Sequence, residues 1–285
     1  MRHSVGAREG GVPRPGRRSL LRGLAGGLAV TATAGAAGCR SEPADVDGSP
    51  VRVERGTLSA AGFTDAAWAL ARPEGEETVP LCLALHGQGG DHGMIIGAGG
   101  LELEDVLAGL LDEGAAPFAV AAIDGGDTYW HPREDGTDSG ALVMKHLVPA
   151  VEEHGVDAST LGFIGWSMGG YGSLRLAGAL GRSRVAAVAA VSPALWESWR
   201  EVPDVAFDDE EDYEEHRVTG RQRDLRGIPV RIDCGESDFF YEAARDYAEG
   251  FESVETHFGP GDHTMDYWGE VAPAQLGWLG RHLTG

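Results

Sequence analysis

The chain has 285 residues and carries 23 Lys and Arg against 45 Asp and Glu, which gives a formal net charge of −22. This excess argues against nucleic acids and anionic membrane surfaces as partners, because charges of the same sign repel. The length, and the alternation of apolar strand-like runs with helical patterns, predict one large α/β domain without internal repeats.

The first 38 residues are predicted to be an export signal. Residues 17–22 are RRSLLR, and a weakly apolar run rich in Gly and Ala follows them, a pattern typical of twin-arginine signals. The apolar run from Gly23 to Gly38 has 16 residues, whereas a membrane-spanning helix needs about 20. Removal of residues 1–38 takes away six arginines and one glutamate and changes the net charge to −27.

Residues 36–39, AAGC, resemble a lipobox, at which bacterial lipoproteins are cleaved before the new N-terminal cysteine is acylated. Ala36 stands where leucine is usual. Two alternatives therefore stay open: a cell-envelope lipoprotein attached to the membrane through a lipidated Cys39, and a plain secreted protein cut near the same place. Residues 39–50, rich in Ser, Pro, Asp and Gly, are expected to form a flexible tether ahead of one folded domain over residues 51–285.

Strands and helices alternate through the folded domain, which predicts a mostly parallel eight-stranded sheet flanked by helices. Pro149 is expected to kink or shorten the second helix. The expected strands are 51–54, 66–71, 79–85, 118–123, 160–164, 185–191, 228–234 and 254–258, and the expected helices are 101–112, 139–154, 168–180, 241–249 and 267–282.

The loop after the predicted strand 79–85 is a candidate anion-binding loop. Its sequence, HGQGGDH at 86–92, contains glycines that let the backbone approach a ligand closely. The amide N–H of Gln88 is therefore a candidate donor to negative charge that develops on a bound carbonyl. His86 is expected to brace this loop.

Residues 161–172, LGFIGWSMGGYG, pass from an apolar run straight into a helix-forming stretch. Gly165 and Gly169 flank Ser167 in the G-x-S-x-G pattern of a nucleophile elbow, a turn so tight that both flanking positions must be small. The Ser167 hydroxyl would then lie at a helix N-terminus, with the N–H of Met168 as a second oxyanion donor. In a chain with 44 glycines the pattern also arises by chance, so the context must decide.

The context supplies an acid and a base in the order Ser, Asp/Glu, His that serine hydrolases of the α/β type require. The predicted strand 228–234 ends in Gly235-Glu236-Ser237-Asp238, which places carboxylates at a strand end. The next strand ends in GPGDH, with His263 on the last strand-to-helix loop. Asp238 and His263 are thus the predicted acid and base.

Aromatic residues beside these loops are candidate substrate contacts. Tyr129, Trp130 and His131 end the segment DGGDTYWH, which follows the predicted strand 118–123 and so lies at the active-site edge. For these three residues, pocket walls and loop packing stay equal alternatives. Trp166, next to the nucleophile, is expected to pack at the elbow and to touch a substrate only secondarily.

No disulfide, metal or cofactor is expected. Cys82 and Cys234 would lie three strand spacings apart in the sheet, about 14 Å, whereas a disulfide needs Cα atoms within about 7 Å. The acidic run 208–212 lies in the insert between Pro193 and Arg226 and lacks the Asp-x-Asp-x-Asp-Gly pattern of a calcium loop.

Several motifs together resemble the putative esterase (esterase D-type) family of the α/β-hydrolase superfamily, which also includes secreted mycolyltransferases, feruloyl esterases and S-formylglutathione hydrolases. The resemblance implies an α/β-hydrolase catalytic domain with a small cap insert over the pocket, and it favours Asp238 over Glu236 or Asp233 as the acid. The matching motifs are LHGQGG, DGGDTYWHP, GWSMGGYGSLRLA, SPALW, DCGESDFF and GPGDHTMDYW.

The expected function is an exported carboxylic ester hydrolase that uses a Ser167-Asp238-His263 triad and an acyl-enzyme, with a small-molecule or a glycan or lipid ester as substrate. Two alternatives remain at this point. One is acyl transfer to a sugar or lipid alcohol, as in the mycolyltransferases, and the other is a non-catalytic surface-binding protein that keeps the fold. The sequence leaves the oligomeric state open.

Overall fold

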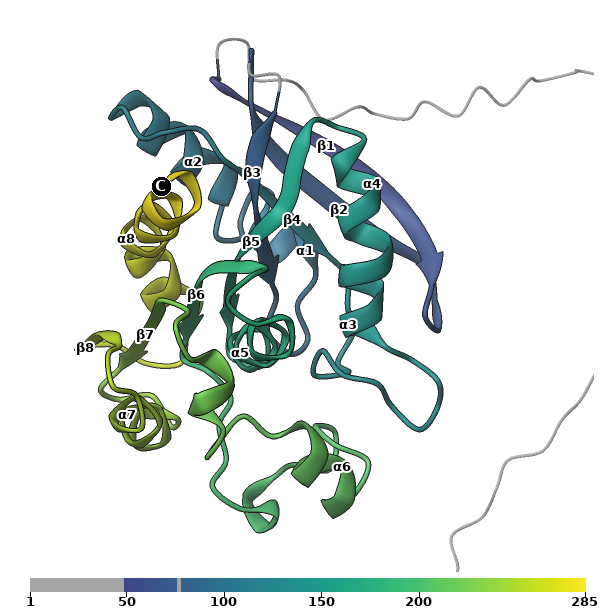
Figure 1. Cartoon of the computed structure of the whole chain (residues 1–285), viewed down its shortest axis with the longest axis vertical. Helices are drawn as coiled ribbons and strands as arrows, with labels where there is room; N and C mark the ends of the chain where they lie inside the picture. The colour runs from purple at the N-terminus through teal and green to yellow at the C-terminus, as the bar shows by residue number, and fades with distance from the viewer. Residues whose placement is uncertain (1–48, 76–77) are drawn as a thin grey trace, which may run out of the picture. The chain divides into compact units, whose positions relative to one another are not determined.

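The computed structural model describes residues 49–75 and 78–285 (Figure 1). The predicted export signal, Cys39 and most of the predicted tether lie outside these residues. Within them, no helix combines the length and the apolar character that crossing a bilayer requires.

One eight-stranded sheet forms the centre of the domain, and its strand order is β1-β2-β4-β3-β5-β6-β7-β8. β1 and β2 pair antiparallel, β2 is antiparallel to β4, and the remaining neighbours are parallel. The predicted mostly parallel sheet is therefore confirmed. The strands are β1 (Val51–Ala60), β2 (Phe63–Pro73), β3 (Val79–Leu85), β4 (Ala119–Ile123), β5 (Val156–Trp166), β6 (Val185–Val191), β7 (Val230–Gly235) and β8 (Glu255–Gly259).

Helices cover both faces of this sheet (Figure 1). On one face, α2 (Leu103–Asp112) and α8 (Met265–Thr284) pack on a core that includes Trp166, Ile164 and Cys82. The other face carries α5 (Met168–Leu180), α7 (Tyr241–Glu249) and a helical run at 139–152. β3, β4 and β6 are buried on both faces, which explains their continuous apolar runs.

The first two strands are longer than predicted. They form a hairpin whose turn, Ala61-Gly62, has positive φ at both residues (52° and 88°), as a two-residue turn of a twisted hairpin requires. Gly56 interrupts the strand pattern of β1 in the sequence, so the strand was predicted to end before it. A glycine is needed there because a Cβ would lie 2.7 Å from the Trp68 ring.

The helical run at 139–152 also differs from the prediction. It consists of α3 (Ser139–Ala141), a π-helical segment η1 (Leu142–Leu147) and α4 (Val148–Glu152), with Pro149 in the first turn of α4. The N–H of Val148 bonds the carbonyl of Val143, five residues back. Pro149 itself has no N–H to donate, and the wider π turn lets the chain continue through it without a break.

The insert between β6 and β7 forms the small cap. It contains two 3₁₀ turns, η2 (Trp199–Glu201) and η3 (Gln222–Leu225), and the short helix α6 (Glu210–His216), which the sequence analysis did not predict. The remaining short helix, α1 (His92–Ile95), follows the glycine-rich loop after β3.

Cys82 and Cys234 are free and buried on β3 and β7, with β5 and β6 between them, so the prediction of two unpaired thiols is confirmed. Burial raises the pKa of both thiols well above the ordinary value, which leaves neither suited to act as a nucleophile.

Candidate active site

Ser167 lies at the sharp turn between β5 and α5 with φ 53° and ψ −116°, a strained backbone conformation for a residue with a side chain. The two flanking glycines are required by contact. A Cβ at Gly165 would lie 2.2 Å from the carbonyl oxygen of Gly169, and one at Gly169 would lie 1.9 Å from that of Leu85. The sequence pattern thus forms the predicted elbow, with the serine at the N-terminus of α5.

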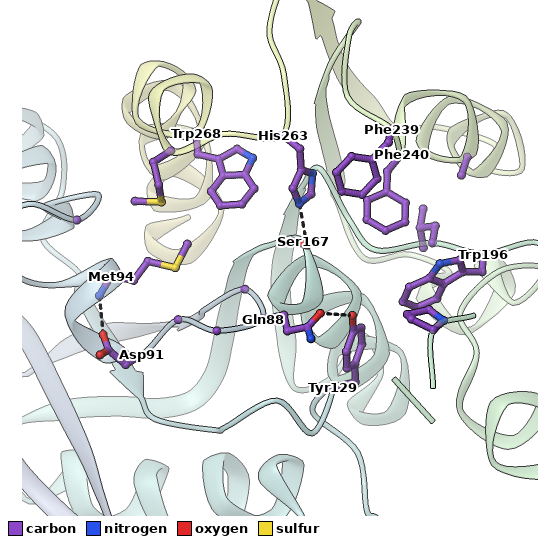
Figure 2. A pocket seen from close by; sticks show the side chains of 18 of the residues that line it. Gln88, Asp91, Met94, Tyr129, Ser167, Trp196, Phe239, Phe240, His263 and Trp268 are labelled. Atoms are coloured by element: carbon purple, nitrogen blue, oxygen red, sulfur yellow. Dashed lines mark hydrogen bonds between the residues drawn. The ribbon is translucent and has the colours of Figure 1, made fainter. Parts of the chain in front are cut away.

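Ser167, His263 and Asp238 form one hydrogen-bonded chain, although they come from three separate strand ends. His263 Nδ1 lies 2.9 Å from Asp238 Oδ2. Its Nε2 lies 2.9 Å from Ser167 Oγ, the contact drawn as a dashed line in Figure 2. Because a carboxylate only accepts, the Nδ1–H donates to Asp238, and Nε2 is left to accept from the serine hydroxyl. This tautomer is the one that a general base needs.

Asp238 is buried and is surrounded by hydrogen-bond donors. It accepts from His263, from the N–H of Phe240 at 2.8 Å and from the hydroxyl of Ser192. Burial alone would raise the pKa of this carboxyl group, but these hydrogen bonds outweigh burial and hold its pKa below the ordinary value. Asp238 is therefore ionised at neutral pH, as a group that stabilises a cationic imidazole must be.

Ser192 connects this carboxylate to the first turn of α8. The indole N–H of Trp268 donates to Ser192 Oγ at 3.0 Å, which leaves the serine hydrogen free to donate to Asp238. The indole ring also contacts the His263 ring edge-on with centroids 4.9 Å apart, while Phe239 lies on the other side at 4.3 Å. The imidazole is thus held between two aromatic rings.

The two alternative acids point elsewhere. Glu236 is exposed. Asp233 is buried, but its carboxylate accepts from Arg231 at 2.9 Å and from Gln275 at 2.8 Å. Only Asp238 among the three carboxylates bonds His263.

The loop after β4 holds the glycine-rich loop 86–92 in place. The Gly125 N–H donates to His86 Nε2 at 2.9 Å, so the His86 Nδ1–H donates to the Gly87 carbonyl at 2.8 Å. Through these two hydrogen bonds His86 joins the glycine-rich loop to the loop after β4, as the predicted bracing role requires. Asp127 accepts from the Gly89 N–H at 2.7 Å, and Asp124 accepts from the backbone N–H of His92 at 2.7 Å.

Both candidate oxyanion donors lie at the positions that this loop and the elbow define. Gln88 lines the pocket beside Ser167. Its side-chain Oε1 accepts from the Tyr129 hydroxyl at 3.2 Å, and its backbone N–H takes no part in this bond. Over residues 49–75 and 78–285, the amide N–H groups of Gln88 and Met168 have no hydrogen-bond acceptor. Two free amides beside the serine are what an oxyanion hole requires.

The serine and the histidine lie at the surface of a cavity of about 1180 Å³ (Figure 2). Its walls come from the loops after β3, β4, β7 and β8, from the cap and from the first turns of α7 and α8. The aromatic and thioether side chains in these walls are Met94, Tyr129, Trp196, Phe239, Phe240, Met265 and Trp268, and the carboxylates are Asp91, Glu197, Glu201 and Glu242.

Of the four candidate substrate contacts, only Tyr129 lines this cavity. Trp130, His131 and Trp166 have none of their surface exposed, so the loop-packing alternative holds for Trp130 and His131, and Trp166 packs in the interior without the secondary substrate contact that was predicted. Tyr129 and Trp130 both have positive φ (53° and 58°), and this turn directs the second ring into the interior.

Packing explains where the three buried side chains go. Trp130 lies against Gly125 and Gly172, where a Cβ would come within 2.5 Å of its ring. His131 packs on Phe207 of the cap at 4.8 Å between ring centroids. Trp166 lies in the core beneath α8, because its place on β5 directs it to that face of the sheet.

Comparison with protein families supports this site. The model of the family described as "Putative esterase" matches residues 131–278, slightly more than half of the chain, and the match includes Ser167, Asp238 and His263. The chain belongs to this esterase family. It is accordingly a carboxylic ester hydrolase of the α/β-hydrolase class, and the predicted family is confirmed.

Solved structures of esterases share the fold over nearly their whole length. A ferulic acid esterase is 20% identical with a TM-score of 0.69, and the alignment covers 82% of this chain and 98% of that one. An S-formylglutathione hydrolase from Agrobacterium tumefaciens is 16% identical with a TM-score of 0.67, covering 83% and 97%. A fluorophosphonate-binding serine hydrolase from Staphylococcus aureus is 16% identical with a TM-score of 0.65, covering 81% and 99%. A search of curated protein sequences gives no match.

Several residues that support the site of this esterase could not be identified from the motifs in its sequence. Asp127, in the loop after β4, accepts from the Gly89 N–H. Ser192 and Asp124 also bond a predicted site residue or its loop, and both follow directly on a strand of the sheet, β6 and β4. A polar residue immediately after a buried parallel strand is the signal that could have identified them, because such positions meet at one edge of the sheet. Trp196 and Phe240 in the pocket carry no comparable signal.

Proposed function

We propose that this esterase is an exported serine hydrolase that cleaves carboxylic esters through Ser167, His263 and Asp238. The observation that carries the proposal is the continuous hydrogen-bonded chain from Asp238 through His263 to Ser167, which ends at the surface of the large cavity. A serine at a strained turn that opens on a cavity, a correctly oriented base and a buried ionised acid are the requirements for nucleophilic catalysis on an acyl group.

The mechanism begins with attack of Ser167 Oγ on the substrate carbonyl. His263 Nε2 takes the serine proton as the C–O bond forms, and Asp238 stabilises the resulting imidazolium. The amides of Gln88 and Met168 hold the oxyanion of the tetrahedral intermediate. His263 then gives its proton to the leaving alcohol, and an acyl-enzyme remains. Water, activated by the same histidine, attacks this ester, releases the acid and restores the serine.

A fluorophosphonate probe tests this mechanism. The purified protein is treated with the probe, digested and analysed by mass spectrometry, and the adduct is expected on the peptide that contains Ser167. The Ser167→Ala variant, checked for native folding by circular dichroism, should not be labelled. An adduct on another residue, or equal labelling of the variant, would contradict the proposal.

The composition of the cavity wall points to esters that are bulky, aromatic and not anionic. Aromatic rings from the cap, the loop after β4 and the loops after β7 and β8 surround Ser167. The four charged side chains that line the cavity are all carboxylates, and the described part of the chain places no lysine or arginine in this wall. A negatively charged substrate would therefore be repelled, since clefts lined by one sign of charge repel ligands of that sign.

The similar structures name two types of substrate, ferulic acid esters and S-formylglutathione. The carboxylates in the cavity wall favour the aromatic acid ester of these two. Glutathione carries a net negative charge at neutral pH. The neighbour named as a ferulic acid esterase acts on an ester of a planar aromatic acid, which suits walls built from Tyr129, Trp196 and Phe240.

We expect the charge of the substrate to change kcat/KM in a predictable direction. The ethyl, choline and glycolate esters of one aromatic acid share the acyl group but are neutral, cationic and anionic. The glycolate ester should be the poorest substrate, by about threefold to tenfold, and added salt should narrow the difference. The double variant Glu197→Gln/Glu201→Gln should also reduce the difference in kcat/KM between the ethyl and glycolate esters. The control Glu152→Gln/Glu153→Gln should leave this difference unchanged, because both residues are exposed and lie outside the cavity. A glycolate ester cleaved as fast as the ethyl ester would refute this selectivity.

We also propose that the twin-arginine signal exports the protein and that Cys39 is its lipidation site. Twin-arginine export carries folded proteins, which suits an α/β domain whose described cysteines are both free. Replacing Arg17 and Arg18 by Lys should keep the protein inside the cell, whereas Cys39→Ala should change only its partition between membrane and soluble fractions. Fractionation with an N-terminal sequence of the recovered protein is the measurement. Parental protein found in the cytoplasm with an uncut N-terminus would contradict both parts.

A further inference from the structure

A second cluster of ligating side chains lies under the cap, outside the cavity that contains Ser167. His131 comes from the loop after β4, and Asp212 and His216 lie one turn apart on α6. Asp212 Oδ1 is 3.6 Å from His131 Nδ1 and 3.5 Å from His216 Nε2. The three ligand atoms all lie within 4.8 Å of one another.

These separations match a small divalent transition metal. Zinc binds histidine nitrogen at about 2.0–2.1 Å and carboxylate oxygen at about 2.0–2.2 Å, usually with four tetrahedral ligands. Two tetrahedral ligands at such bond lengths are roughly 3.3–3.5 Å apart, from the same bond lengths. The two distances to Asp212 Oδ1 are already close to this value.

The hydrogen bonds of His131 give an independent reason to expect a cation. The side chain is fully buried, with Nε2 3.0 Å from the Ala206 carbonyl oxygen and Nδ1 2.9 Å from the Pro132 carbonyl oxygen. Carbonyl oxygens only accept, and a neutral imidazole has one N–H. One ring nitrogen therefore faces an oxygen lone pair with nothing between them.

A metal ion bound to one ring nitrogen removes this conflict, because the lone pair of that nitrogen is then used to bind the ion. If the Nε2–H donates to the Ala206 carbonyl, the Nδ1 lone pair is free for a metal. Histidine ligands usually donate their other N–H to a backbone carbonyl or carboxylate in this way.

The surroundings carry an excess of negative charge. Glutamates and aspartates dominate residues 208–215, and Asp212 is the only one of them within the cluster. Arginines nearby partly offset them: Arg133 pairs with Asp208, Arg217 pairs with Glu214, and Arg175 carries a further positive charge near His216. The acidic residues of this segment still outnumber the arginines that lie beside it, which include Arg221.

We propose that His131, Asp212 and His216 bind one divalent transition-metal ion, best fitted by zinc, with the Pro132 carbonyl or water as the fourth ligand. The donor set of two imidazoles and one carboxylate selects zinc over calcium and magnesium, which prefer oxygen ligands. Sequence spacing alone did not show this site, because His131 is far from α6 along the chain and only the cap brings them together.

The ion would fasten α6 to the body of the domain and steady one wall of the active-site cavity. The Tyr213 hydroxyl of α6 donates to the Trp196 carbonyl at 2.9 Å, and Trp196 lines the cavity. The Tyr171 hydroxyl of α5 donates to the His216 carbonyl at 2.8 Å. The role is structural, and it does not depend on how the ester is cleaved.

Zinc titration of the EDTA-treated protein tests the site without any activity assay. Isothermal titration calorimetry should show one zinc bound per chain, and His216→Gln should weaken the affinity at least about 100-fold, since loss of a direct ligand should cost no less than loss of its supporting partner. His257→Gln, an exposed histidine on β8, is the matched control and should bind zinc like the parent. Calcium should give no binding to the same site.

Melting temperature separates a metal site from a plain ion pair. Zinc should raise the melting temperature of the parent and of His257→Gln but not that of His216→Gln, because only a ligand bound by the folded state stabilises it. In EDTA, the His216→Gln variant should melt close to the parent. The proposal fails if the parent binds no zinc, if His216→Gln binds it as tightly as the parent, or if His216→Gln loses equal stability with and without zinc.

Discussion

Asp238→Asn should lower kcat by a factor on the order of 10⁴, as loss of a triad acid can, while the protein keeps its fold. The amide has almost the same shape as the carboxylate and can still accept the Phe240 N–H with its oxygen. Its NH₂ group, however, cannot accept from His263, so the imidazole would adopt the tautomer that places a hydrogen on Nε2. That tautomer cannot take the proton of Ser167. Steady-state kinetics on an aromatic ester and a circular dichroism melt are the measurements.

Glu236→Gln is the matched control, because this neighbouring carboxylate is exposed and is not hydrogen-bonded to His263. It should keep near-parental turnover. If Glu236→Gln loses activity while Asp238→Asn retains it, the acid is misassigned, although the order serine, acid, histidine would survive. A loss of stability in Asp238→Asn that parallels its loss of turnover would likewise remove the catalytic interpretation.

The sheet and the three residues of the hydrogen-bonded chain could be predicted because both depend on local sequence. The buried strands β3, β4 and β6 are uniformly apolar, and each of the three residues lies at or just beyond the carboxyl end of a parallel strand. Parallel strands bring their carboxyl ends to one edge of the sheet. The order along the chain was then enough to expect Ser167, Asp238 and His263 together.

The direction of the aromatic side chains after β4 could not be predicted. It depends on two consecutive residues, Tyr129 and Trp130, in a left-handed backbone conformation that side-chain-bearing residues rarely adopt. Tertiary contacts hold them there: Tyr129 bonds Gln88, and Trp130 fills space left by Gly125 and Gly172. The sequence DGGDTYWH therefore does not indicate which of the two rings points into the interior.

The cap was hidden from sequence analysis for a related reason. α6 has seven residues, most of them acidic, so it lacks the apolar periodicity that marks longer helices. It is fixed instead by single anchors, among them the buried Tyr213 and the Asp209 side chain that caps its first turn. The distance between His131 and α6 therefore follows from the folded structure alone.

Gly169→Ala should lower the free energy of unfolding by about 4 kcal/mol, at the upper end of single-residue effects, and should abolish turnover with it. The added Cβ would lie 1.9 Å from the carbonyl oxygen of Leu85 and 2.7 Å from that of His86. Both are backbone atoms of β3 and the glycine-rich loop, so no side-chain rotation relieves the clash. The elbow can only move away from the loop, which separates Ser167 from the amide of Gln88.

Gly109→Ala is the control for Gly169→Ala, because it should raise the free energy of unfolding slightly instead of lowering it. Gly109 is an exposed residue inside α2, and a Cβ there would have no atom within 4 Å. Alanine in a helix is more stable than glycine by about 0.5–1 kcal/mol, so this variant should unfold at a slightly higher urea concentration than the parent and keep its turnover. Urea titrations of both variants, followed by circular dichroism, give the comparison. A Gly169→Ala protein as stable and active as the parent would mean that β5, Ser167 and α5 do not form the tight elbow on which the proposed catalysis depends.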